Sequence, residues 1–411
     1  MDYKTAREYI SSLTGRGICP GLSAVSALLD ALENPEKNLD IIHIAGTNGK
    51  GSVGAYLSAI IQYTGHTVMR FVTPPVGGYL STFLYSGAPV SEADFAECVS
   101  ELKAAIDTLE NDGIYPTSFE GETAIAFLLA QKLKPDYVLL ECGMGGANDA
   151  TNVIPPPTLA VITKISLDHT AFLGSTVAQI AKEKAGIIKS GTMVVSAIQH
   201  PDADLILREK CEAEGVSLTV ADAPQSIIYN PDYTAFSYGG ESYRTQLLGT
   251  YQPENAALAI EAAKALGLGS AAIRNGIAAA KWEYRFEKCK SFILDGAHNP
   301  DGVKALAESL KKYFKKGDDI AFVCACFRDK DYMETARLTA TFPSAVYCVK
   351  APTERGLDAK TLCEAFTKHG AKAYECPTLD TAIRSAAKHK NAVVFGTLSI
   401  LSEAKQIIEG I

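Results

Sequence analysis

The sequence predicts an α/β protein in which parallel β-sheets are covered by helices. Short apolar runs typical of buried strands alternate along most of the chain with stretches whose apolar residues recur at helical spacing. This alternation is typical of strand–helix–strand units, which build parallel sheets. The chain has 411 residues, and since single hydrophobic cores stop growing near ~250–300 residues, we expect two domains. We place them at residues 1–282 and 284–411, because a helical stretch ends at this boundary and "FILDGAHNPDG" then begins a fresh strand–loop–helix unit.

The expected elements follow in chain order. The run "LDIIHIAG" (39–46) is expected to be a buried strand, and the next helix runs from Ser52 to Gly65. Further strands are expected at 137–141, 159–163, 192–197, 291–295, 320–326, 345–349 and 392–396. Helices are expected at 122–133, 176–188, 254–266 and 301–314. Residues 215–250 have a different sequence pattern, and their short strand-like runs indicate antiparallel strands.

Composition narrows the classes of function. The formal net charge is −8 and the sequence pI is about 5.5, which argues against nucleic acid as the main partner. No apolar run approaches the ~20 residues of a membrane span, and the N-terminal "MDYKTAREYISSLTGRG" is polar and amphipathic, unlike a signal peptide. The ten cysteines are scattered without the spacing of a zinc site, and we interpret them as mostly buried, reduced thiols. These features predict a cytoplasmic protein.

The stretch "HIAGTNGKGSV" (43–53) joins a predicted strand to a predicted helix. Glycines let a backbone approach a ligand closely, a helix N-terminus attracts anions, and Lys50 adds a full positive charge. The segment from Gly46 to Ser52 reads G-x-x-G-K-G-S and matches the usual phosphate loop imperfectly. A glycine-rich turn with an exposed lysine is the alternative, but the position between strand and helix favours a phosphate site.

The stretch "LLECGMGGANDATN" (139–152) places a carboxylate at the end of a strand. Glu141 ends the apolar run, and the Gly-rich loop that follows carries Asp149 and Asn152. Because ligands of parallel sheets bind at the carboxyl ends of the strands, Glu141 is positioned to hold Mg²⁺ on a nucleotide. A solvated glutamate at a strand end is the alternative.

A third segment, residues 165–191, combines a histidine with a charged helix. His169 follows a strand, and Thr176 or Ser175 can cap a helix that contains Lys184. Taken alone, the charges of this helix are typical of a solvated face. A lone histidine is likewise more often structural than a ligand.

A fourth segment, residues 282–302, places polar residues after another strand. Asp295 ends the strand, and "GAHNP" makes a loop into a helix from Asp301. Asp, His and Asn therefore cluster at a predicted ligand edge. On spacing alone, a binding site and a polar loop are both compatible with this cluster.

The motifs "GTNGKGS", "E-x-G-x-GG…DATN", "LDHTAFLG-STVAQIAKEKAGIIK", "LLGTYQPENAALAI" and "RFE…ILDGAHNP" occur in this order. Together they closely resemble the folylpolyglutamate synthase/dihydrofolate synthase family, a branch of the Mur ligases, over nearly the whole chain. The resemblance implies a two-domain Mur-ligase-like fold, with a parallel-sheet P-loop ATPase domain and a smaller Rossmann-like C-terminal domain. It also implies an ATP-dependent amide ligase that adds L-glutamate to a folate through an acyl phosphate, with dihydrofolate synthesis as a second activity of the family.

The resemblance implies roles for individual residues. ATP phosphates are held by the loop residues Gly46, Thr47, Asn48, Gly49, Lys50, Gly51 and Ser52. Mg²⁺ is bound by Ser52, Glu141 and His169, and a carbamylated Lys184 helps to bind a second Mg²⁺. The nucleotide is also contacted by Gln252, Asn255, Arg285, Asp295 and His298. The catalytic set is Lys50, His169, Lys184 and His298.

The acceptor side departs from the family pattern. Relatives usually read S-P-H-L-x₄-E-R-I, whereas residues 73–90 here read "TPPVGGYLSTFLYSGAPV". The usual His is Pro75, the usual Glu-Arg is Ser81-Thr82, and a later Arg is Ala147. One explanation is drift, with contacts rebuilt from nearby residues such as Arg70, Tyr79 or Tyr85. The other is a changed acceptor, either a folate in a different state or a non-folate acid.

Two further functions are compatible with the nucleotide motifs. One is a related carboxylate–amine ligase that acts on a non-folate acid. The other is a nucleotide-binding regulatory protein that has lost turnover, which the joint presence of Lys50, Glu141, His169, Lys184, Asp295 and His298 weakens. A simple kinase or NTPase would not need the "DGAHNP" unit. The expected partners are small molecules, namely ATP, L-glutamate and a folate or pteroate carboxylate, and the expected state is a monomer.

Overall fold

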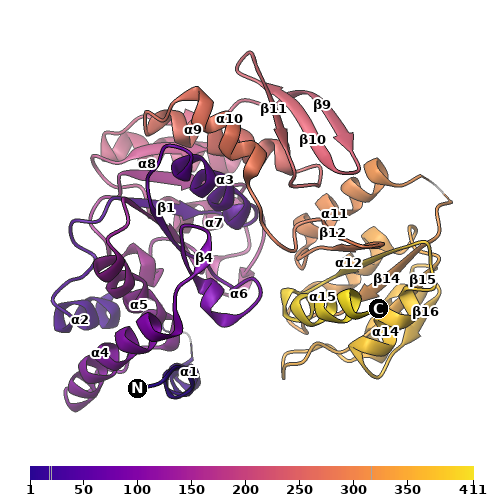
Figure 1. Cartoon of the computed structure of the whole chain (residues 1–411), viewed down its shortest axis with the longest axis horizontal. Coiled ribbons are helices and arrows are strands. Elements are labelled where there is room, and N and C mark those ends of the chain that lie inside the picture. Colours follow the sequence, from indigo (N-terminus) through magenta and orange to yellow (C-terminus); the bar gives the residue numbers. More distant parts are fainter. Residues whose placement is uncertain (18, 20, 316) are drawn as a thin grey trace. The chain divides into compact units, whose positions relative to one another are not determined.

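A computed structural model describes residues 1–17, 19, 21–315 and 317–411 (Figure 1). The chain forms two compact units, each of which combines segments that are separated in the sequence. The first comprises Met1–Pro75, Tyr79–Ala223 and Glu254–Ala279, and the second comprises Val76–Gly78, Pro224–Pro253 and Ala280–Ile411. The assignment of ligase domains to residues 1–282 and 284–411 stays a prediction, because compactness alone does not define a folding domain.

The first unit is built on an eight-stranded sheet of order β4-β3-β2-β5-β1-β6-β7-β8. Its strands are β1 (Ile41–Ala45), β2 (Val68–Phe71), β3 (Phe83–Tyr85), β4 (Ala88–Pro89), β5 (Tyr137–Glu141), β6 (Leu159–Ile162), β7 (Met193–Ser196) and β8 (Leu218–Val220). The six strands from β2 to β8 in this order are parallel, and β3 and β4 add an antiparallel edge. The strands predicted at 137–141, 159–163 and 192–197 are therefore confirmed.

One strand prediction in this sheet was wrong. Residues 217–220 were expected to belong to a set of antiparallel strands, but β8 pairs in parallel with β7. Helix α8 (Pro201–Glu214) lies between the two strands in the chain and provides the crossover that a parallel pair requires.

Helices cover both faces of this sheet (Figure 1). They are α1 (Tyr3–Ser12), η1 (Leu13–Arg16), α2 (Ser23–Ala31), α3 (Lys50–Gln62), η2 (Tyr79–Thr82), α4 (Glu92–Asn111), α5 (Ser118–Leu133), η3 (Ala150–Val153), α6 (Thr170–Leu173), α7 (Val177–Ala185), α8, α9 (Gln252–Ala265) and α10 (Ser270–Ala279). One core joins α1, α2, α4 and α5 to sheet residues that include Phe71 and Leu140. Helix α3 packs on β1, β2, β5 and α10. Since side chains alternate along a strand, Arg70 and Glu141, the sequence neighbours of Phe71 and Leu140, face the side of α3.

Local sequence explains where the helices near the predicted site begin. Helix α3 begins at Lys50, two residues earlier than expected, because Gly49 adopts the left-handed conformation with φ +96°. Helix α7 begins after Thr176, whose hydroxyl accepts a hydrogen bond from the Gln179 N–H at 3.2 Å in a capping box. Thr176 and Ser175 were the two predicted caps of this helix, and Thr176 is the one that caps it.

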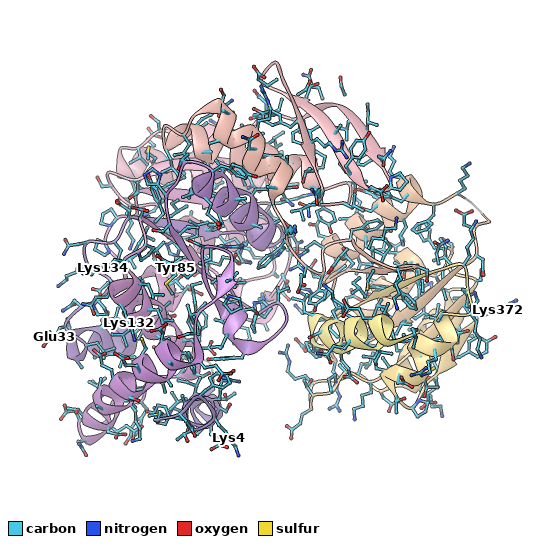
Figure 2. All side chains as sticks on the ribbon, viewed as in Figure 1. Lys4, Glu33, Tyr85, Lys132, Lys134 and Lys372 are labelled. Atoms are coloured by element: carbon cyan, nitrogen blue, oxygen red, sulfur yellow. The ribbon has the colours of Figure 1, made fainter. Side chains whose placement is uncertain are left out.

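Charged side chains such as Lys4 and Lys134 are exposed (Figure 2).

The second unit has two sheets. A three-stranded antiparallel sheet is formed by β9 (Gln225–Asn230), β10 (Tyr233–Tyr238) and β11 (Glu241–Thr245). A six-stranded sheet of order β12-β13-β17-β14-β15-β16 is formed by β12 (Glu287–Cys289), β13 (Phe292–Leu294), β14 (Ile320–Cys324), β15 (Ala345–Cys348), β16 (Ala373–Glu375) and β17 (Asn391–Phe395). All its strands except β12 are parallel. The antiparallel prediction therefore holds for β9 to β11.

Helices also form two groups around the six-stranded sheet. They are α11 (Pro300–Tyr313), α12 (Tyr332–Thr339), α13 (Ala359–Lys368), α14 (Leu379–Ala386), η4 (Leu398–Ile400) and α15 (Leu401–Gly410). Residues of α11, α12 and α13 belong to one core cluster, and residues of α14 and α15 belong to another. Such a sheet between two helical layers has its ligand edge at the carboxyl ends of the strands.

The structure bears on two predictions made from composition, namely buried reduced cysteines and the lack of a membrane span. All ten cysteines are free thiols, and most are buried, as predicted. None of the helices in the described part of the chain combines the length and apolar character that a membrane crossing needs.

Candidate functional site

The phosphate loop lies between the end of β1 and the start of α3. Gly46 has φ +151°, and a Cβ there would lie 1.8 Å from Thr163 Oγ1. At Gly49 a Cβ would lie 2.5 Å from Asn255 Oδ1, in addition to the positive φ. Both positions therefore require glycine, and the loop approaches Thr163, the residue after β6, and helix α9 more closely than a side chain would allow.

Hydrogen bonds fix this loop to the segment that follows β6. The Thr47 N–H donates to Lys164 O at 2.9 Å, and the Asn48 N–H donates to the same oxygen at 3.3 Å. The Thr47 hydroxyl donates to Ser166 O at 2.9 Å and accepts from the Ser166 N–H at 3.0 Å. The backbone of the loop is thus held in place by the chain itself.

Two lysines from different elements contact one carbonyl of the loop. Lys50 Nζ donates to Gly46 O at 3.0 Å, and Lys184 Nζ, from α7, donates to the same oxygen at 2.9 Å. Lys184 is 5% exposed. Burial, with a further contribution from the positive charge of Lys50, lowers the pKa of Lys184 to about 7. A large part of this amine is therefore neutral near pH 7.

The predicted magnesium ligands Ser52 and Glu141 lie around the first turns of α3. Ser52 is in the first turn, and a Cβ on Gly54 would lie 3.1 Å from Glu141 Oε1. Glu141 is buried and accepts a hydrogen bond from Arg70 Nη2 at 3.1 Å. A hydroxyl and a carboxylate are the hard oxygen donors that Mg²⁺ prefers, so these two residues fit the ion.

His169 differs from these two residues. It is exposed, has φ +50° and stands at the N-cap of α6, where its N–H donates to Asp168 Oδ1 at 2.8 Å. Three residues earlier, Ser166 is bonded to Thr47 of the phosphate loop. No group of three His, Cys, Asp or Glu side chains suited to a metal occurs within the described residues. A magnesium site does not need one, because Mg²⁺ usually keeps one or two protein carboxylates, phosphate oxygens and water.

A buried polar network that the sequence analysis missed lies under the Gly-rich loop after β5. His43 Nε2 lies 2.9 Å from Thr151 Oγ1 and 3.2 Å from Cys142 Sγ. The Thr151 hydroxyl donates to Asp149 Oδ1, and Asp149 Oδ2 accepts from the Met144 N–H at 2.7 Å. Burial lowers the pKa of His43 to about 3, so the ring stays neutral. His43 is part of the quoted loop motif, but nothing in the sequence pairs it with residues about a hundred positions away.

Two residues proposed to rebuild the acceptor side make internal contacts. The Tyr79 hydroxyl donates to Glu122 Oε1 at 2.7 Å, and the guanidinium carbon of Arg7 lies 3.1 Å from the centre of the Tyr79 ring. Burial raises the pKa of Glu122. Arg70 is buried beside Glu141.

Two other residues of the predicted acceptor side, Tyr85 and Ala147, lie on different elements. Tyr85 lies in β3, on the antiparallel edge of the sheet (Figure 2). Ala147 packs closely on α7, since a Cβ on Gly186 would lie 2.4 Å from Ala147 Cα.

Helix α9 carries two of the predicted nucleotide residues. Asn255, in the first unit, lies against Gly49 of the phosphate loop. Gln252 is three residues earlier, buried, and belongs to the second unit. The structure therefore brings Asn255 to the loop through contacts within one unit.

The second unit gathers Arg285, Asp295 and His298 at the carboxyl end of β13. Asp295 accepts hydrogen bonds at its two oxygens from the Phe286 N–H, the Ala297 N–H and the Tyr251 hydroxyl, at 2.8, 2.8 and 2.9 Å. Burial raises the pKa of Asp295, which these donors and Arg285 oppose. A Cβ on Gly296 would lie 2.3 Å from Arg285 Nη1, and His298 Nδ1 lies 2.8 Å from Gly296 O. The predicted cluster is thus a compact loop organised around one carboxylate.

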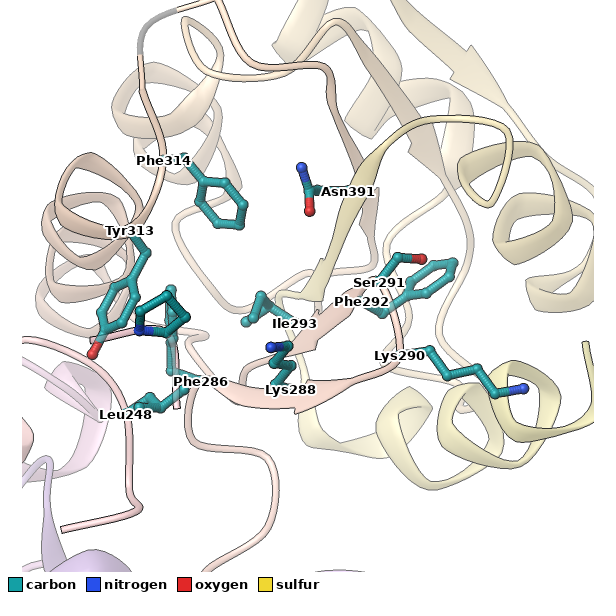
Figure 3. Close-up of a pocket in the computed structure, with 11 residues that line it drawn as sticks. Leu248, Phe286, Lys288, Lys290, Ser291, Phe292, Ile293, Tyr313, Phe314 and Asn391 are labelled. Carbon is teal, nitrogen blue, oxygen red and sulfur yellow. The ribbon is translucent and has the colours of Figure 1, made fainter. Parts of the chain in front are cut away.

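A pocket of about 150 Å³ lies elsewhere in the second unit (Figure 3). Ser291 and Phe292 line it at the start of β13, and Asn391 lines it at the start of β17. Tyr313 and Phe314, at the end of α11, also line it. This pocket is at the amino ends of the strands, the opposite end from Asp295, so it is not at the predicted ligand edge.

Comparison with known proteins gives consistent matches over the chain. The Mur ligase middle domain matches residues 44–263, and the Mur ligase glutamate ligase domain matches residues 284–396. The chain is 34% identical to a dihydrofolate synthase/folylpolyglutamate synthase of Bacillus subtilis (strain 168), with 98% of each chain covered.

Two solved structures extend this likeness to the fold. Mycobacterium tuberculosis folylpolyglutamate synthase complexed with ADP and AMPPCP matches with a TM-score of 0.90 at 27% identity, with 99% of both chains covered. Escherichia coli FolC in complex with DHPP and ADP matches with a TM-score of 0.88 at 26% identity, covering 100% of this chain and 98% of that one. The predicted two-domain Mur-ligase-like fold class is confirmed, and the enzyme class is that of the ATP-dependent acid–amino-acid ligases. The chain belongs to the folylpolyglutamate synthase/dihydrofolate synthase family of Mur ligases.

Proposed function

We propose that this protein joins L-glutamate to the carboxylate of a folate at the expense of ATP. The observation that carries the proposal is the geometry of the phosphate loop. It holds Lys50 and Lys184 on one carbonyl and has Glu141 buried against its helix, in a chain of this ligase family. A cation at the phosphate loop, here Lys50, and a hard anionic donor packed on its helix, here Glu141, are parts that phosphoryl transfer needs.

The reaction has two steps. A folate carboxylate oxygen attacks the γ-phosphorus of ATP, so that ADP leaves and an acyl phosphate forms. The amine of L-glutamate then attacks the acyl carbon, inorganic phosphate leaves, and the amine loses a proton as the amide forms. Because the acyl phosphate is reactive, the site must exclude water during both steps.

Residues of the first unit are proposed to bind the phosphates and the Mg²⁺ ion. Lys50 and the amides of the loop from Gly46 to Ser52 bind the phosphates and offset their negative charge. Ser52, Glu141 and His169 are the proposed ligands of Mg²⁺, which when bound polarises the transferred phosphoryl group. Asn255 braces the loop at Gly49.

Lys184 is proposed to act as a carbamate. Its neutral amine attacks CO₂, a C–N bond forms and a proton is released. The side chain then ends in an anionic carbamate with two oxygens. The pKa of about 7 supports this proposal, because only the neutral amine reacts. The product would contribute to a second Mg²⁺ site, which a positively charged lysine would repel.

The second unit contributes the other proposed nucleotide contacts. They are Gln252, Arg285, Asp295 and His298. We assign the ATPase and ligase roles to the domains at 1–282 and 284–411. The proposed enzyme acts as a monomer in the cytoplasm on small-molecule substrates.

A phosphate-release assay with ATP and Mg²⁺ tests this function. A panel of carboxylates that includes dihydropteroate, tetrahydrofolate and non-folate acids is assayed with and without L-glutamate. The proposal predicts phosphate release that requires both a folate and L-glutamate, with a product heavier by one glutamyl residue. Release that requires only ATP, or that follows a non-folate acid, would contradict it.

A further inference from the structure

Arg70 is a charged residue that no step above uses, although it is among the most deeply buried cations of the first unit. Its side chain is 5% exposed, and that of its partner Glu141 is 2% exposed. A buried ion pair is costly to form unless its geometry is good and its remaining hydrogen-bonding groups are satisfied. The burial of the Arg70–Glu141 ion pair therefore needs an explanation, because the pair is not part of the charged protein surface.

One nitrogen of Arg70 joins two parts of the predicted site. Arg70 Nη2 donates to Glu141 Oε1 at 3.1 Å and to Gly51 O, in the phosphate loop motif, at 3.0 Å. The strand register explains this reach. Arg70 of β2 pairs with Leu139 of β5, so Glu141 is the next residue on the same face toward the carboxyl end.

Helix α3 leaves no spare room around this contact. A Cβ on Gly54 would lie 2.8 Å from Arg70 Nη2 and 3.1 Å from Glu141 Oε1. The guanidinium, the carboxylate and the first turns of the helix therefore pack against one another at a glycine. A side chain at this position would displace one of the two charged groups.

We propose that Arg70 is a positioning residue that fixes Glu141 and the phosphate loop relative to each other, and so sets them for the metal–nucleotide complex. The inference rests on the proposed metal role of Glu141. A planar guanidinium offers several donors in a rigid fork, so it can hold a carboxylate and a carbonyl at once. A side chain that orients a metal ligand acts on metal-dependent binding more than on the nucleotide itself.

The test compares nucleotide binding with and without metal in the full-length protein. Calorimetry gives the affinity for AMPPCP in Mg²⁺ and in EDTA, and the ratio of the two is the enhancement by metal. In Arg70→Met this enhancement falls about tenfold, the lower end of the effect expected for a residue behind a metal ligand, while the EDTA affinity changes much less. Arg70→Lys keeps part of the enhancement, since an ammonium can still donate to Glu141.

A second pair of variants covers the case in which Arg70→Met does not fold. Gly54→Ala keeps both charges but presses on the contact, and it also reduces the enhancement. Gly121→Ala is the matched control, because a Cβ at this helical glycine meets its nearest atoms at 3.4 Å, an ordinary contact. Circular dichroism checks that each variant is folded.

The outcomes separate this inference from the proposed function. An unchanged enhancement in folded Arg70→Met and Gly54→Ala overturns the positioning role, as does an equal loss of affinity in Mg²⁺ and in EDTA. Glu141→Gln is measured alongside. If it loses the enhancement while Arg70→Met keeps it, only the role of Arg70 fails. If Glu141→Gln keeps the enhancement, the metal role of Glu141 fails and the inference fails with it.

Discussion

The predicted nucleotide side and the predicted acceptor side of the first unit are held together in different ways. On the nucleotide side, Lys50, Lys184 and Arg70 each donate to backbone carbonyls of the phosphate loop. On the acceptor side, Tyr79 is held by other side chains, through its hydrogen bond to Glu122 and the ring contact with Arg7. Backbone partners are present whatever the sequence, whereas side-chain partners change with it. A substitution at Glu122 or Arg7 would therefore remove a partner of Tyr79, whereas the carbonyls that accept from Lys50 and Lys184 remain whatever side chains the loop carries.

The largest effect is expected at Glu141, where the nucleotide side depends on one carboxylate. Glu141→Ala should lower kcat by about 10²–10³-fold, because a group that helps to stabilise the transferred charge is lost. It also leaves Arg70 buried without its carboxylate, which costs about 3–5 kcal/mol of folding stability. Steady-state assays at limiting Mg²⁺ and urea unfolding measure the two effects.

Glu141→Gln separates these effects, because an amide oxygen still accepts from Arg70 but binds Mg²⁺ poorly. His169→Ala should also lower kcat, by no more than Glu141→Ala does, and with little loss of folding stability, since His169 is exposed. Turnover that is unimpaired in either the Glu141 or the His169 variant would refute that residue's metal role.

The next effect concerns Lys184, whose amine donates to the same loop carbonyl as Lys50. Lys184→Ala should lower kcat by about 10²-fold, and a short added carboxylate should restore part of it by supplying the missing oxygens. Native mass spectrometry under CO₂ should show about one extra CO₂ on the wild-type protein only. A fully active Lys184→Ala enzyme would rule out the carbamate.

The pKa of Lys184 determines how enzyme activity should change with pH. Because this pKa is about 7, the amine gains a proton below that pH and can no longer react with CO₂. At limiting CO₂, wild-type activity should therefore fall as the pH drops from 8 to 6, and the activity of rescued Lys184→Ala should not show this loss. Equal pH profiles would show that the amine does not control the acid side.

A smaller effect is expected on the acceptor side. Pro75, Thr82 and Ala147 stand where the resemblance implies an imidazole and two arginines. We therefore expect this chain to make fewer ionic contacts to its acceptor. We expect dihydropteroate to be at least about tenfold poorer in kcat/KM than tetrahydrofolate, since one lost ionic contact is worth roughly this factor. A kcat/KM for dihydropteroate that equals the kcat/KM for tetrahydrofolate would overturn this prediction.

The smallest effect tests whether side-chain anchoring matters for the acceptor loop. Tyr79→Phe removes the donor to Glu122 but keeps the ring against Arg7. The KM for the folate should rise about two- to tenfold, the range for one hydrogen bond, with the KM for ATP unchanged. Tyr63→Phe is the control, because Tyr63 is exposed. A matching change in both KM values would mean that Tyr79 supports the fold rather than the acceptor.

The sequence predicted the positions of elements and residues best where a pattern is local. The phosphate loop, Thr176 as a helix cap and Glu141 at a strand end all follow from spacing within a few residues. The direction of β8 could not be read in this way, because it depends on the crossover through α8. The contacts of Arg70 and His43 join residues about 70 and 100 positions away, and no local pattern records such pairings. The charges on α7 look solvated in the sequence, yet Lys184 is buried because α7 packs along the Gly-rich loop.

The connectivity of the two units limits how this protein can be divided. The chain passes from one unit to the other after residues 75, 78, 223, 253 and 279. A gene cut near residue 282 would therefore separate strands β9 to β11 from the unit with which they cluster. Each unit joins segments that are separated in the sequence by segments of the other unit. We therefore expect the two units to acquire structure together rather than in the order of synthesis. Recombination that exchanges one half between relatives would likewise have to carry three separate stretches of sequence.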